Sequence, residues 1–301
     1  MQYQLADLRF DSDRPLPEIR LAPEGEAPEV HVRWHEPAPL RVAAHFSVWH
    51  TPFGGVWLSF AAVDGGFLLT FEQWGQFLVS ADAAEVHVYS APGTPELSMR
   101  HLLLNQVLPL VLSRRGRLVV HASAVSWRQQ VLAFVGRSGA GKSTIAAACA
   151  TLGAHLVTDD CLVLRRRGDA WVAWPYDAGL RLWPEALRQL GWPTAAGVAV
   201  AHFTEKKRLS LDLTPCLPEE TVRPLARMFL MARESATRLS GRDGLTVLAS
   251  NVFRLDARDA AESRAHFDAL ADLVLTVPID TAPKGDPLEA AAAVLCRMDQ
   301  P

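Results

Sequence analysis

The sequence predicts a mixed α/β protein, in which a small β-rich region precedes a larger unit of alternating strands and helices. Three observations predict this fold class. Residues 1 to about 92 contain short segments rich in valine, phenylalanine and tryptophan, separated by turn residues. From residue 117 onward, apolar strand-like segments alternate with helical ones. A glycine-rich loop joins one of these strands to the helix that follows it. We therefore expect a β-rich N-terminal region at residues 1–93 and an α/β domain at residues 94–301.

Strands of the N-terminal region are expected at VRW, LRVAAHFSVW, GVWLSFAAV, GFLLTF and EVHVYS, with a hairpin turn at residues 64–66. A helix then opens the second domain, because Thr94 is a good N-cap, Pro95 suits the first helical position and several leucines supply an apolar face. Pro109 is expected to kink or end this helix, since proline lacks the N–H that a helix interior uses. Gly116 closes the segment.

The second domain is predicted from its order of apolar and turn segments. RLVVHASAVSW and QVLAFVG predict two strands joined by a tight turn, and STIAAACATLG predicts a helix. AHLVTDDCLVLRRR is expected as one strand that forms a hairpin with AWVAWPY. Further helices are expected at LWPEALRQLG, SRAHFDALADLVL and DPLEAAAAVLCRM, and further strands at KKRLSLDL, RPLARMFLMAR and VLTVPI.

Composition excludes several classes of partner. The formal net charge is −3, so the chain lacks the excess of basic residues that indicates a nucleic-acid-binding protein. The most apolar region, HLLLNQVLPLVL, is interrupted by Asn105, Gln106 and Pro109 and falls short of the roughly 18 residues that span a bilayer. The four cysteines are scattered without a C-x-x-C pair, which is typical of free thiols in a reducing compartment. The segment MQYQLADLRF carries acids and no apolar run, so no signal peptide is expected and the predicted location is cytoplasmic.

The segment GRSGAGKS fits the pattern G-x-x-x-x-G-K-[ST] at Gly136, Gly141, Lys142 and Ser143. An apolar strand leads in and a helix leads out, which is the context in which this pattern binds nucleotide phosphates. Glycines let backbone N–H groups approach phosphate oxygens closely, and the helix presents its positive end to the anion. Lys142 is expected to reach the terminal phosphates, and Ser143 is expected to offer its hydroxyl to Mg²⁺.

Two neighbouring acids, Asp159 and Asp160, follow the predicted helix closely. Mg²⁺ at such a loop needs a second anchor, commonly an Asp at the end of an apolar strand. Because neighbouring strand residues face opposite sides, the two carboxylates point apart unless the strand is bulged or ends there. One carboxylate is expected to meet Mg²⁺, and the other to orient an acceptor hydroxyl and take its proton. A structural role, such as capping a loop or pairing with an arginine, is the alternative for either acid.

His121 lies in LVVHASAV, on the strand that precedes the loop-bearing strand. Two interpretations stay open from chemistry alone. The side chain is either a core histidine with one satisfied hydrogen bond or a site residue that the hairpin brings to the phosphates. Strand order decides between them, and the sequence does not give that order.

The succession of these motifs resembles a known family. HASAV, a short turn, an apolar strand into G-x-S-G-x-G-K-S, a helix and then G-x-x-L-x-x-D-D is similar to the HPr kinase/phosphorylase family, most closely to its HPr-kinase-related serine kinases of the lasso-peptide type. The resemblance spans about residues 94 to 280. It implies a P-loop kinase core of the HPr kinase and phosphoenolpyruvate carboxykinase-like type, and Mg²⁺- and ATP-dependent phosphorylation of a serine hydroxyl.

The resemblance also implies roles for single residues. His121 is expected beside the transferred phosphate together with the catalytic Lys142, while Asp159 and Asp160 divide metal binding and proton abstraction, with Ser143 as a further metal ligand. The residues expected to hold phosphates are Gly136, Arg137, Ser138, Gly139, Ala140, Gly141, Lys142, Ser143 and Thr144.

The sequence departs from that family at several positions. Arg137 and Thr144 stand where HPr kinases usually carry Asp and Glu. The glycine-rich segment with a central arginine, which serves their phosphorylase activity, is replaced by AGLRLW with Arg181. These departures argue against phosphorolysis and against HPr as the substrate. Arg181, Lys207 and Arg208 are candidates for contacting phosphate or an acidic substrate, with solvated surface charge as the alternative.

The function expected from these features is transfer of the γ-phosphate of ATP, with Mg²⁺, to a serine or similar hydroxyl of a peptide or protein. Two alternatives stay open. One is an ATP-binding scaffold or chaperone without transfer activity, and the other is a small-molecule kinase whose β-rich region helps to form the acceptor pocket. The expected partner is a peptide or protein that carries the acceptor hydroxyl, and neither nucleic acid nor a membrane. The resemblance also allows a homo-oligomer.

Overall fold

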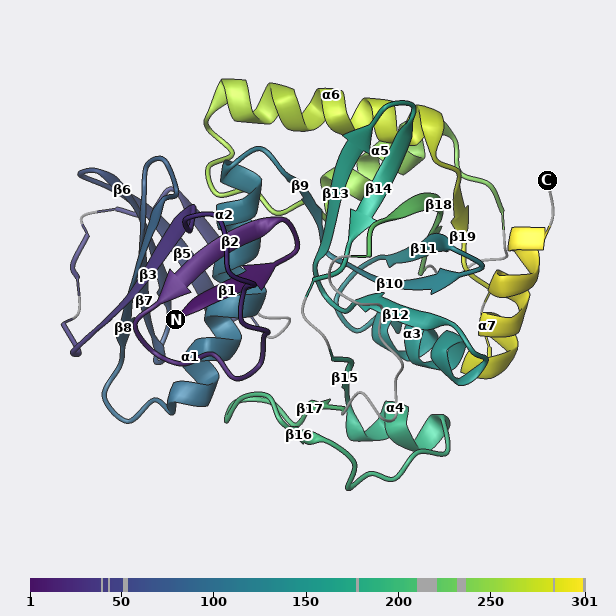
Figure 1. Cartoon of the computed structure of the whole chain (residues 1–301), viewed down its shortest axis with the longest axis horizontal. Helices are drawn as coiled ribbons and strands as arrows, with labels where there is room; N and C mark the ends of the chain where they lie inside the picture. The colour runs from purple at the N-terminus through teal and green to yellow at the C-terminus, as the bar shows by residue number, and fades with distance from the viewer. Residues whose placement is uncertain are drawn as a thin grey trace. The chain divides into compact units, whose positions relative to one another are not determined.

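The chain forms two compact units in a computed structural model that describes residues 1–38, 40–42, 44–50, 54–176, 179–209, 221–231, 237–283 and 285–299. One unit comprises Met1–Arg115 with Ala201–Phe203, and the other Gly116–Val200 with Thr204–Pro301 (Figure 1). The fold is mixed α/β, as the sequence predicts, and its described strands form three sheets. Over the same residues, every helix is too short or too polar to cross a membrane.

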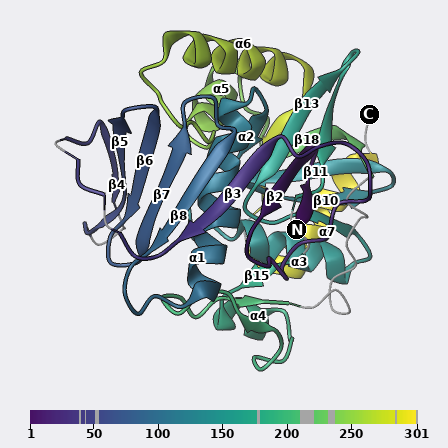
Figure 2. The same cartoon turned by 60° about the vertical axis from the view of Figure 1, so that its left-hand side comes forward.

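The first unit is built on one eight-stranded sheet of order β1-β2-β3-β8-β7-β6-β5-β4, most of which is seen in Figure 2. Its strands are β1 (Gln2–Leu5), β2 (Leu8–Ser12), β3 (Val30–His35), β4 (Ser47–His50), β5 (Val56–Val63), β6 (Gly66–Phe71), β7 (Gly75–Ser80) and β8 (Glu85–Ser90). Alternate residues of β3 are buried, Val30 and Val32 among them, so one face of the sheet carries the core. The sequence did not predict β1 and β2.

A helical segment completes the first unit with α1 (Glu96–Leu102), a π-helical turn η1 (Leu103–Val107) and α2 (Leu108–Arg114). The helical segment does not end at Pro109: the π-helical turn lies directly before α2, and Pro109 falls in the first turn of α2, where its missing N–H is not needed. Arg100 and Arg115 pair with Glu18 and Glu29 of the same unit. The two units therefore divide after Arg115, whereas the sequence suggested a boundary after residue 93.

The second unit contains an eight-stranded sheet with the path β12-β10-β11-β18-β14-β13-β9, and β19 pairs with β18. Its strands are β9 (Leu118–Val120), β10 (Ala122–Trp127), β11 (Gln130–Val135), β12 (His155–Thr158), β13 (Leu162–Arg167), β14 (Ala170–Trp174), β18 (Arg223–Leu230) and β19 (Ile279–Thr281). β11, β18 and β19 run parallel, and the other neighbours are antiparallel. The predicted tight turn between β10 and β11 is present, with Arg128 and Gln129 both at positive φ.

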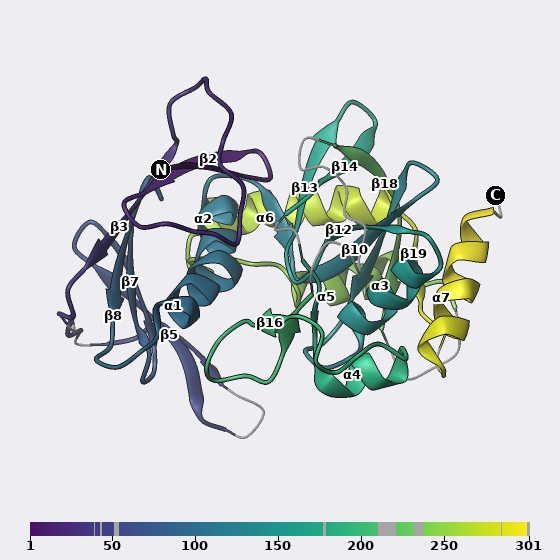
Figure 3. The same cartoon turned by 60° about the horizontal axis from the view of Figure 1, so that its bottom comes forward.

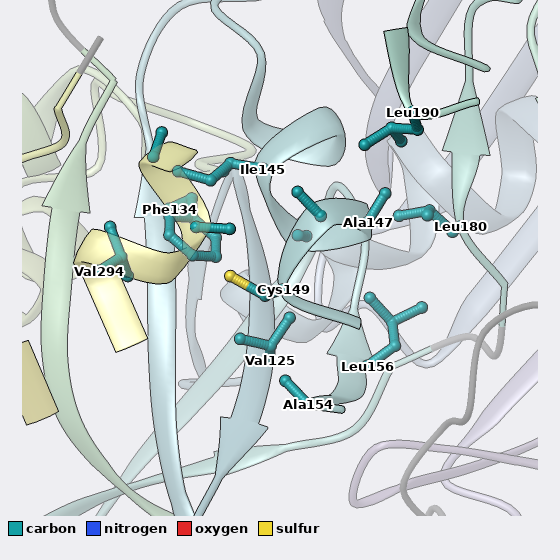
Figure 4. Packing of buried hydrophobic residues seen from close by; sticks show 14 of the residues in the cluster. Val125, Phe134, Ile145, Ala147, Cys149, Ala154, Leu156, Leu180, Leu190 and Val294 are labelled. Atoms are coloured by element: carbon teal, nitrogen blue, oxygen red, sulfur yellow. The ribbon is translucent and has the colours of Figure 1, made fainter. Parts of the chain in front are cut away.

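Helices cover both faces of this sheet. α3 (Lys142–Thr151) and α7 (Pro287–Cys296) lie side by side on one face (Figure 3), and α5 (Gly241–Ala249) and α6 (Ala260–Thr276) pack on the other. Consecutive residues of β11 face the two layers, because strand side chains alternate. Leu132 and Phe134 belong to the cluster around α3 that Figure 4 shows, whereas Val131 and Val135 pack in the cluster that contains Leu270 of α6. The sequence predicted α3, α6 and α7 but not α5.

A third, small sheet of order β15-β17-β16 also belongs to the second unit. It consists of β15 (Arg181–Leu182), β16 (Val198–Ala199) and β17 (Lys207–Arg208), and α4 (Pro184–Gln189) follows β15. The short η2 (Arg297–Asp299) follows α7. The strand expected over KKRLSLDL is described only at Lys207–Arg208, since residues 210–220 lie outside the described part of the chain.

Two predicted strands of the second unit are interrupted. The segment RLVVHASAVSW breaks at His121, between β9 and β10, and AHLVTDDCLVLRRR breaks at residues 159–161, between β12 and β13. At both breaks the chain changes its partners, because β12 pairs with β10 while β13 pairs with β9. The two interruptions are therefore side by side in the sheet, and they bring His121 to the acid pair.

Candidate functional site

The glycine-rich loop lies between β11 and α3, as its motif predicts. Gly136, Gly139 and Gly141 have φ values of 146°, 78° and 92°, which side-chain-bearing residues rarely adopt. A Cβ at Gly139 would meet no atom within 4 Å, so the loop is open there. The N-cap of α3, Gly141, has no side chain to bond the first amides of the helix. These amides and the positive helix end are therefore arranged for an anion.

The other loop residues differ in exposure. Arg137 and Ser138 are exposed, whereas Ala140 and Thr144 are half-buried. The N–H of Ala140 donates to the carbonyl oxygen of Arg137 at 3.1 Å, which closes a turn inside the loop.

Lys142 is buried, and its Nζ donates to the carbonyl oxygens of Gly136 and Arg137 at 2.8 and 3.1 Å. Burial lowers the pKa of Lys142, while the charges of Asp160 and Asp159 act in the opposite direction. The ammonium group thus lies inside the curve of the loop, where the sequence predicted a phosphate-binding lysine.

Asp159 is fully buried and connects three elements. Its Oδ1 accepts hydrogen bonds from the hydroxyls of Ser123 in β10, at 2.6 Å, and of Ser143 in α3, at 2.8 Å. Its Oδ2 accepts the backbone N–H of Arg181 in β15 at 2.9 Å. A carboxylate with three such donors is held in one orientation, directly behind the first turn of α3.

Asp160 lies outside any strand, which corrects the expectation that both acids share one. β12 ends at Thr158, and Asp160 adopts a φ of 76°, in the left-handed region that Asp tolerates better than most residues. This turn frees its carboxylate from the alternation of a strand. The side chain is 18% exposed, and its Oδ2 lies 3.6 Å from Nε of Arg181.

The charge of Asp160 is favoured by its neighbours. Burial by itself raises the pKa of this carboxyl group, but the charges of Arg181 and Lys206, with smaller effects of His121 and Lys142, outweigh burial. The net result is a pKa well below the ordinary value for Asp, so the side chain is ionised at neutral pH.

His121 lies at the break between β9 and β10, against the acid pair. Its backbone N–H donates to the carbonyl oxygen of Asn251 at 2.6 Å, and its Nδ1 lies 3.0 Å from the carbonyl oxygen of Asp160. Because a carbonyl only accepts, Nδ1 carries the proton and Nε2 of the neutral ring is an acceptor. Burial lowers the pKa of His121, which outweighs the opposite effect of Asp160.

Three cations are predicted to contact substrate, and their surroundings in the structure differ. Arg181 is buried, and its Nη2 donates to the backbone oxygen of Asp159 at 2.6 Å, so it holds the acid pair. In the ladder of β15 and β17, Arg181 is opposite Arg208, and Leu182 is opposite Lys207. Directly opposed residues share a face. Leu182 packs in the core around α3, so Lys207 is turned away from the acid pair.

Sequence reasoning missed two residues of the site. The hydroxyl of Ser123 donates to Asp159. The signal for it in the sequence is its place two residues after His121, because residues i and i+2 of a strand lie on the same face. Lys206 acts on both Asp160 and Lys142 through its charge. The sequence predicts the next two residues, Lys207 and Arg208, as substrate contacts and does not single out Lys206. Among the described residues, no group of three or more His, Cys, Asp or Glu side chains could hold a metal ion alone.

No family model matches the chain, and a search of curated proteins gives no match. Among solved structures, the chain is similar to the HPr(Ser) kinase/phosphatase from Coxiella burnetii, with a TM-score of 0.33 and 12% sequence identity over 60% of this chain and 97% of that chain. A likeness at this score carries no weight for fold or activity, so the function is inferred from the residues of the site.

Proposed function

We propose that the second unit is a P-loop kinase core of the HPr kinase and phosphoenolpyruvate carboxykinase-like type, which transfers the γ-phosphate of ATP to a serine or similar hydroxyl of a peptide or protein. One observation carries the proposal. The hydroxyl of Ser143, the last fixed residue of the glycine-rich motif, lies 2.8 Å from the buried carboxylate of Asp159. A loop hydroxyl and a strand-end carboxylate are the two groups that hold Mg²⁺ in P-loop proteins.

The residues of the site fit Mg²⁺ and ATP. Ser143 and Asp159 would hold the ion through oxygen atoms, which Mg²⁺ prefers, and water and phosphate oxygens usually complete its coordination. This accounts for the absence of a larger ligand cluster among the described residues. When bound, Mg²⁺ neutralises charge on the β- and γ-phosphate oxygens. The open space at Gly139 and the uncapped start of α3 suit the phosphates themselves.

Asp160 is the group assigned to the acceptor. An ionised carboxylate accepts a hydrogen bond from the acceptor hydroxyl and orients its oxygen toward the γ-phosphorus. The oxygen forms a bond to that phosphorus while the bond from phosphorus to ADP breaks, and the hydroxyl proton leaves through Asp160. A carboxylate of low pKa is a weak base, but phosphoryl transfer passes through a loose transition state that depends mainly on positioning and charge neutralisation.

The experiment uses the full chain, radiolabelled ATP, Mg²⁺ and a library of serine-containing peptides, with ATP binding measured separately by calorimetry. The wild type should bind ATP and label serine. Asp160→Asn should keep ATP binding and lose transfer, whereas Lys142→Met should lose ATP binding. Asp169→Asn, in an exposed turn, is the control and should behave like the wild type. Undiminished transfer by Asp160→Asn would contradict the proposal, and binding without transfer to any peptide would favour an ATP-binding scaffold.

A further inference from the structure

The small sheet presents one face on which residues of the candidate site continue into exposed side chains. Because directly opposed residues share a face and neighbours along a strand alternate, Arg181, Arg208 and Val198 lie on the same face. The next positions, Trp183 and Lys206, continue this alternation, and Lys206 Nζ lies 5.9 Å from the ring centroid of Trp183. We call these five residues the small-sheet face.

This face begins at the acid pair and carries two exposed apolar side chains. Arg181 anchors one end of it on Asp159 and Asp160. Farther out, Trp183 and Val198 are 46% and 68% exposed. From the acid pair, the small sheet therefore continues into a surface that offers apolar and cationic groups to a ligand.

The small-sheet face is also cationic. Arg181 forms ion pairs with both acids, whereas Lys206 forms none with a carboxylate of the described residues and favours ionised Asp160 only from a distance. The ammonium group of Lys206 lies over an aromatic ring, which stabilises the cation without neutralising it. A ligand that is complementary to this face carries a carboxylate that pairs with Lys206 and an apolar group that packs against Trp183.

The backbone of the small sheet is built to hold this arrangement. Gly197 has a φ of 85°, and a Cβ there would lie 2.4 Å from the carbonyl oxygen of Arg208. Gly179 has a φ of 141°, and a Cβ there would lie 2.8 Å from Nε of Arg208. Both glycines permit a close approach that any side chain would prevent. The face is thus fixed by packing rather than left to loop motion.

We propose that the small-sheet face binds the phosphate acceptor and selects a peptide in which a carboxylate lies next to the acceptor hydroxyl. The inference rests on the kinase function proposed above, and adds its substrate class. Charge complementarity commits the occupant to an anionic peptide, because the face carries Arg208 and Lys206 in addition to the arginine that holds the acid pair. Trp183 and Val198 contact the apolar part of the same peptide. The carboxylate belongs either to an acidic side chain or to a C-terminus, since both present the same group to Lys206.

The test compares three peptides of one sequence that contain a single serine. One is neutral and amidated, one has a glutamate beside the serine and is amidated, and one is neutral with a free C-terminal carboxylate next to the serine. The wild type should phosphorylate one or both carboxylate peptides about fivefold faster than the neutral peptide in kcat/KM, as expected for a partly exposed charge pair. The two carboxylate peptides separate the two sources of the group.

The matched variants are Lys206→Met and Lys207→Met, which remove the same charge from adjacent residues, the first directly before β17 and the second within it. Lys206→Met should abolish the preference for a carboxylate, and Lys207→Met should retain it. Trp183→Ala should raise the KM for every peptide and leave the KM for ATP unchanged. The inference is overturned if Lys206→Met and Lys207→Met show equal preference ratios, if the wild type has no preference, or if Trp183→Ala raises the KM for ATP instead.

A binding arm separates failure of this inference from failure of the kinase function. Fluorescence anisotropy of the labelled peptides measures their affinity without any transfer. If no peptide is phosphorylated, the kinase function fails, but weaker binding of the carboxylate peptides to Lys206→Met than to Lys207→Met still supports the face as an anionic-peptide site. Equal binding to both variants removes that support.

Discussion

Replacing Asp159 by Asn should destabilise the second unit as well as abolish phosphate transfer. The carboxylate is fully buried and accepts three hydrogen bonds, two from hydroxyls at 2.6 and 2.8 Å and one from the backbone N–H of Arg181 at 2.9 Å. Asparagine keeps one acceptor oxygen and puts an NH₂ group where the other stood. In one orientation of the asparagine, its NH₂ group faces the backbone N–H of Arg181, and two donors oppose each other. In the other orientation, the NH₂ group faces the hydroxyls of Ser123 and Ser143, which must then rotate so that their oxygens accept from it.

The size of the effect follows from these contacts. A hydrogen bond to a charged group contributes about 1.5–3 kcal/mol, and breaking a buried ion pair costs about 3–5 kcal/mol. Arg181, which is 2% exposed, loses the carboxylate of Asp159 in the variant and keeps that of Asp160. Since the hydroxyls can reorient, we expect the lower end, a fall of about 3 kcal/mol in the free energy of unfolding. For a unit of this size, that corresponds to a fall of about 6–12 °C in Tm.

Differential scanning calorimetry measures the effect, because two units can give separate transitions. The control is Asp169→Asn, the same chemical change in the exposed turn between β13 and β14, which should alter the free energy of unfolding by less than about 0.5 kcal/mol. If Asp159→Asn unfolds within about 1 kcal/mol of the wild type, the carboxylate does not connect β10, α3 and β15 as described.

Three further predictions concern the loop, the histidine and the thiols. Gly139→Ala and Gly153→Ala both place a side chain at positive φ, and each should lower the free energy of unfolding by about 1 kcal/mol. Only Gly139→Ala should weaken ATP binding in calorimetry, because its methyl group projects into the open part of the loop. Equal affinities of the two variants for ATP would refute this placement. Burial lowers the pKa of His121, so below about pH 6.5 the unfolded chain binds a proton that the folded one does not, and the free energy of unfolding falls until the pH passes the folded pKa. His121→Gln should reduce that fall in urea titrations between about pH 7 and 5, and an unchanged profile would contradict the assignment. Burial raises the pKa of Cys149 to about 12, so maleimide should label exposed Cys296 first and Cys149 only on unfolding. Peptide mass mapping measures the labelling of each thiol, and equal labelling rates of the two cysteines would contradict the packing around α3.

Several elements could be predicted because local physics determines them. The turn at Arg128 and Gln129, the helix after the glycine-rich loop and the helix at Pro287–Cys296 all follow from short-range patterns of turn, glycine and apolar residues. The motif around Lys142 belongs to this group, since its pattern of glycines matches the positive φ values observed. Such features depend on a few neighbouring residues and change little with tertiary context.

Other features depended on pairing between distant segments. The π-helical turn before Pro109 lets the helical segment continue where the sequence indicated a kink or an end. Residues 94–115 belong to the first unit, where Arg100 and Arg115 pair with Glu18 and Glu29, which are far away in sequence. Sequence patterns carry little information on such contacts, because many partners are compatible with the same local composition.

By itself, the sequence determined that this chain has a strand, a glycine-rich loop and a helix in succession, followed by two acids. Tertiary structure alone decided how those acids divide. The strand β10 pairs with β12 while β9 pairs with β13, so both segments break at the same level of the sheet. That shared break puts His121 against Asp160 and turns Asp160 to positive φ, away from Asp159. The physical reason is that register and strand order are set by long-range pairing, whereas loop chemistry is set by the residues of the loop.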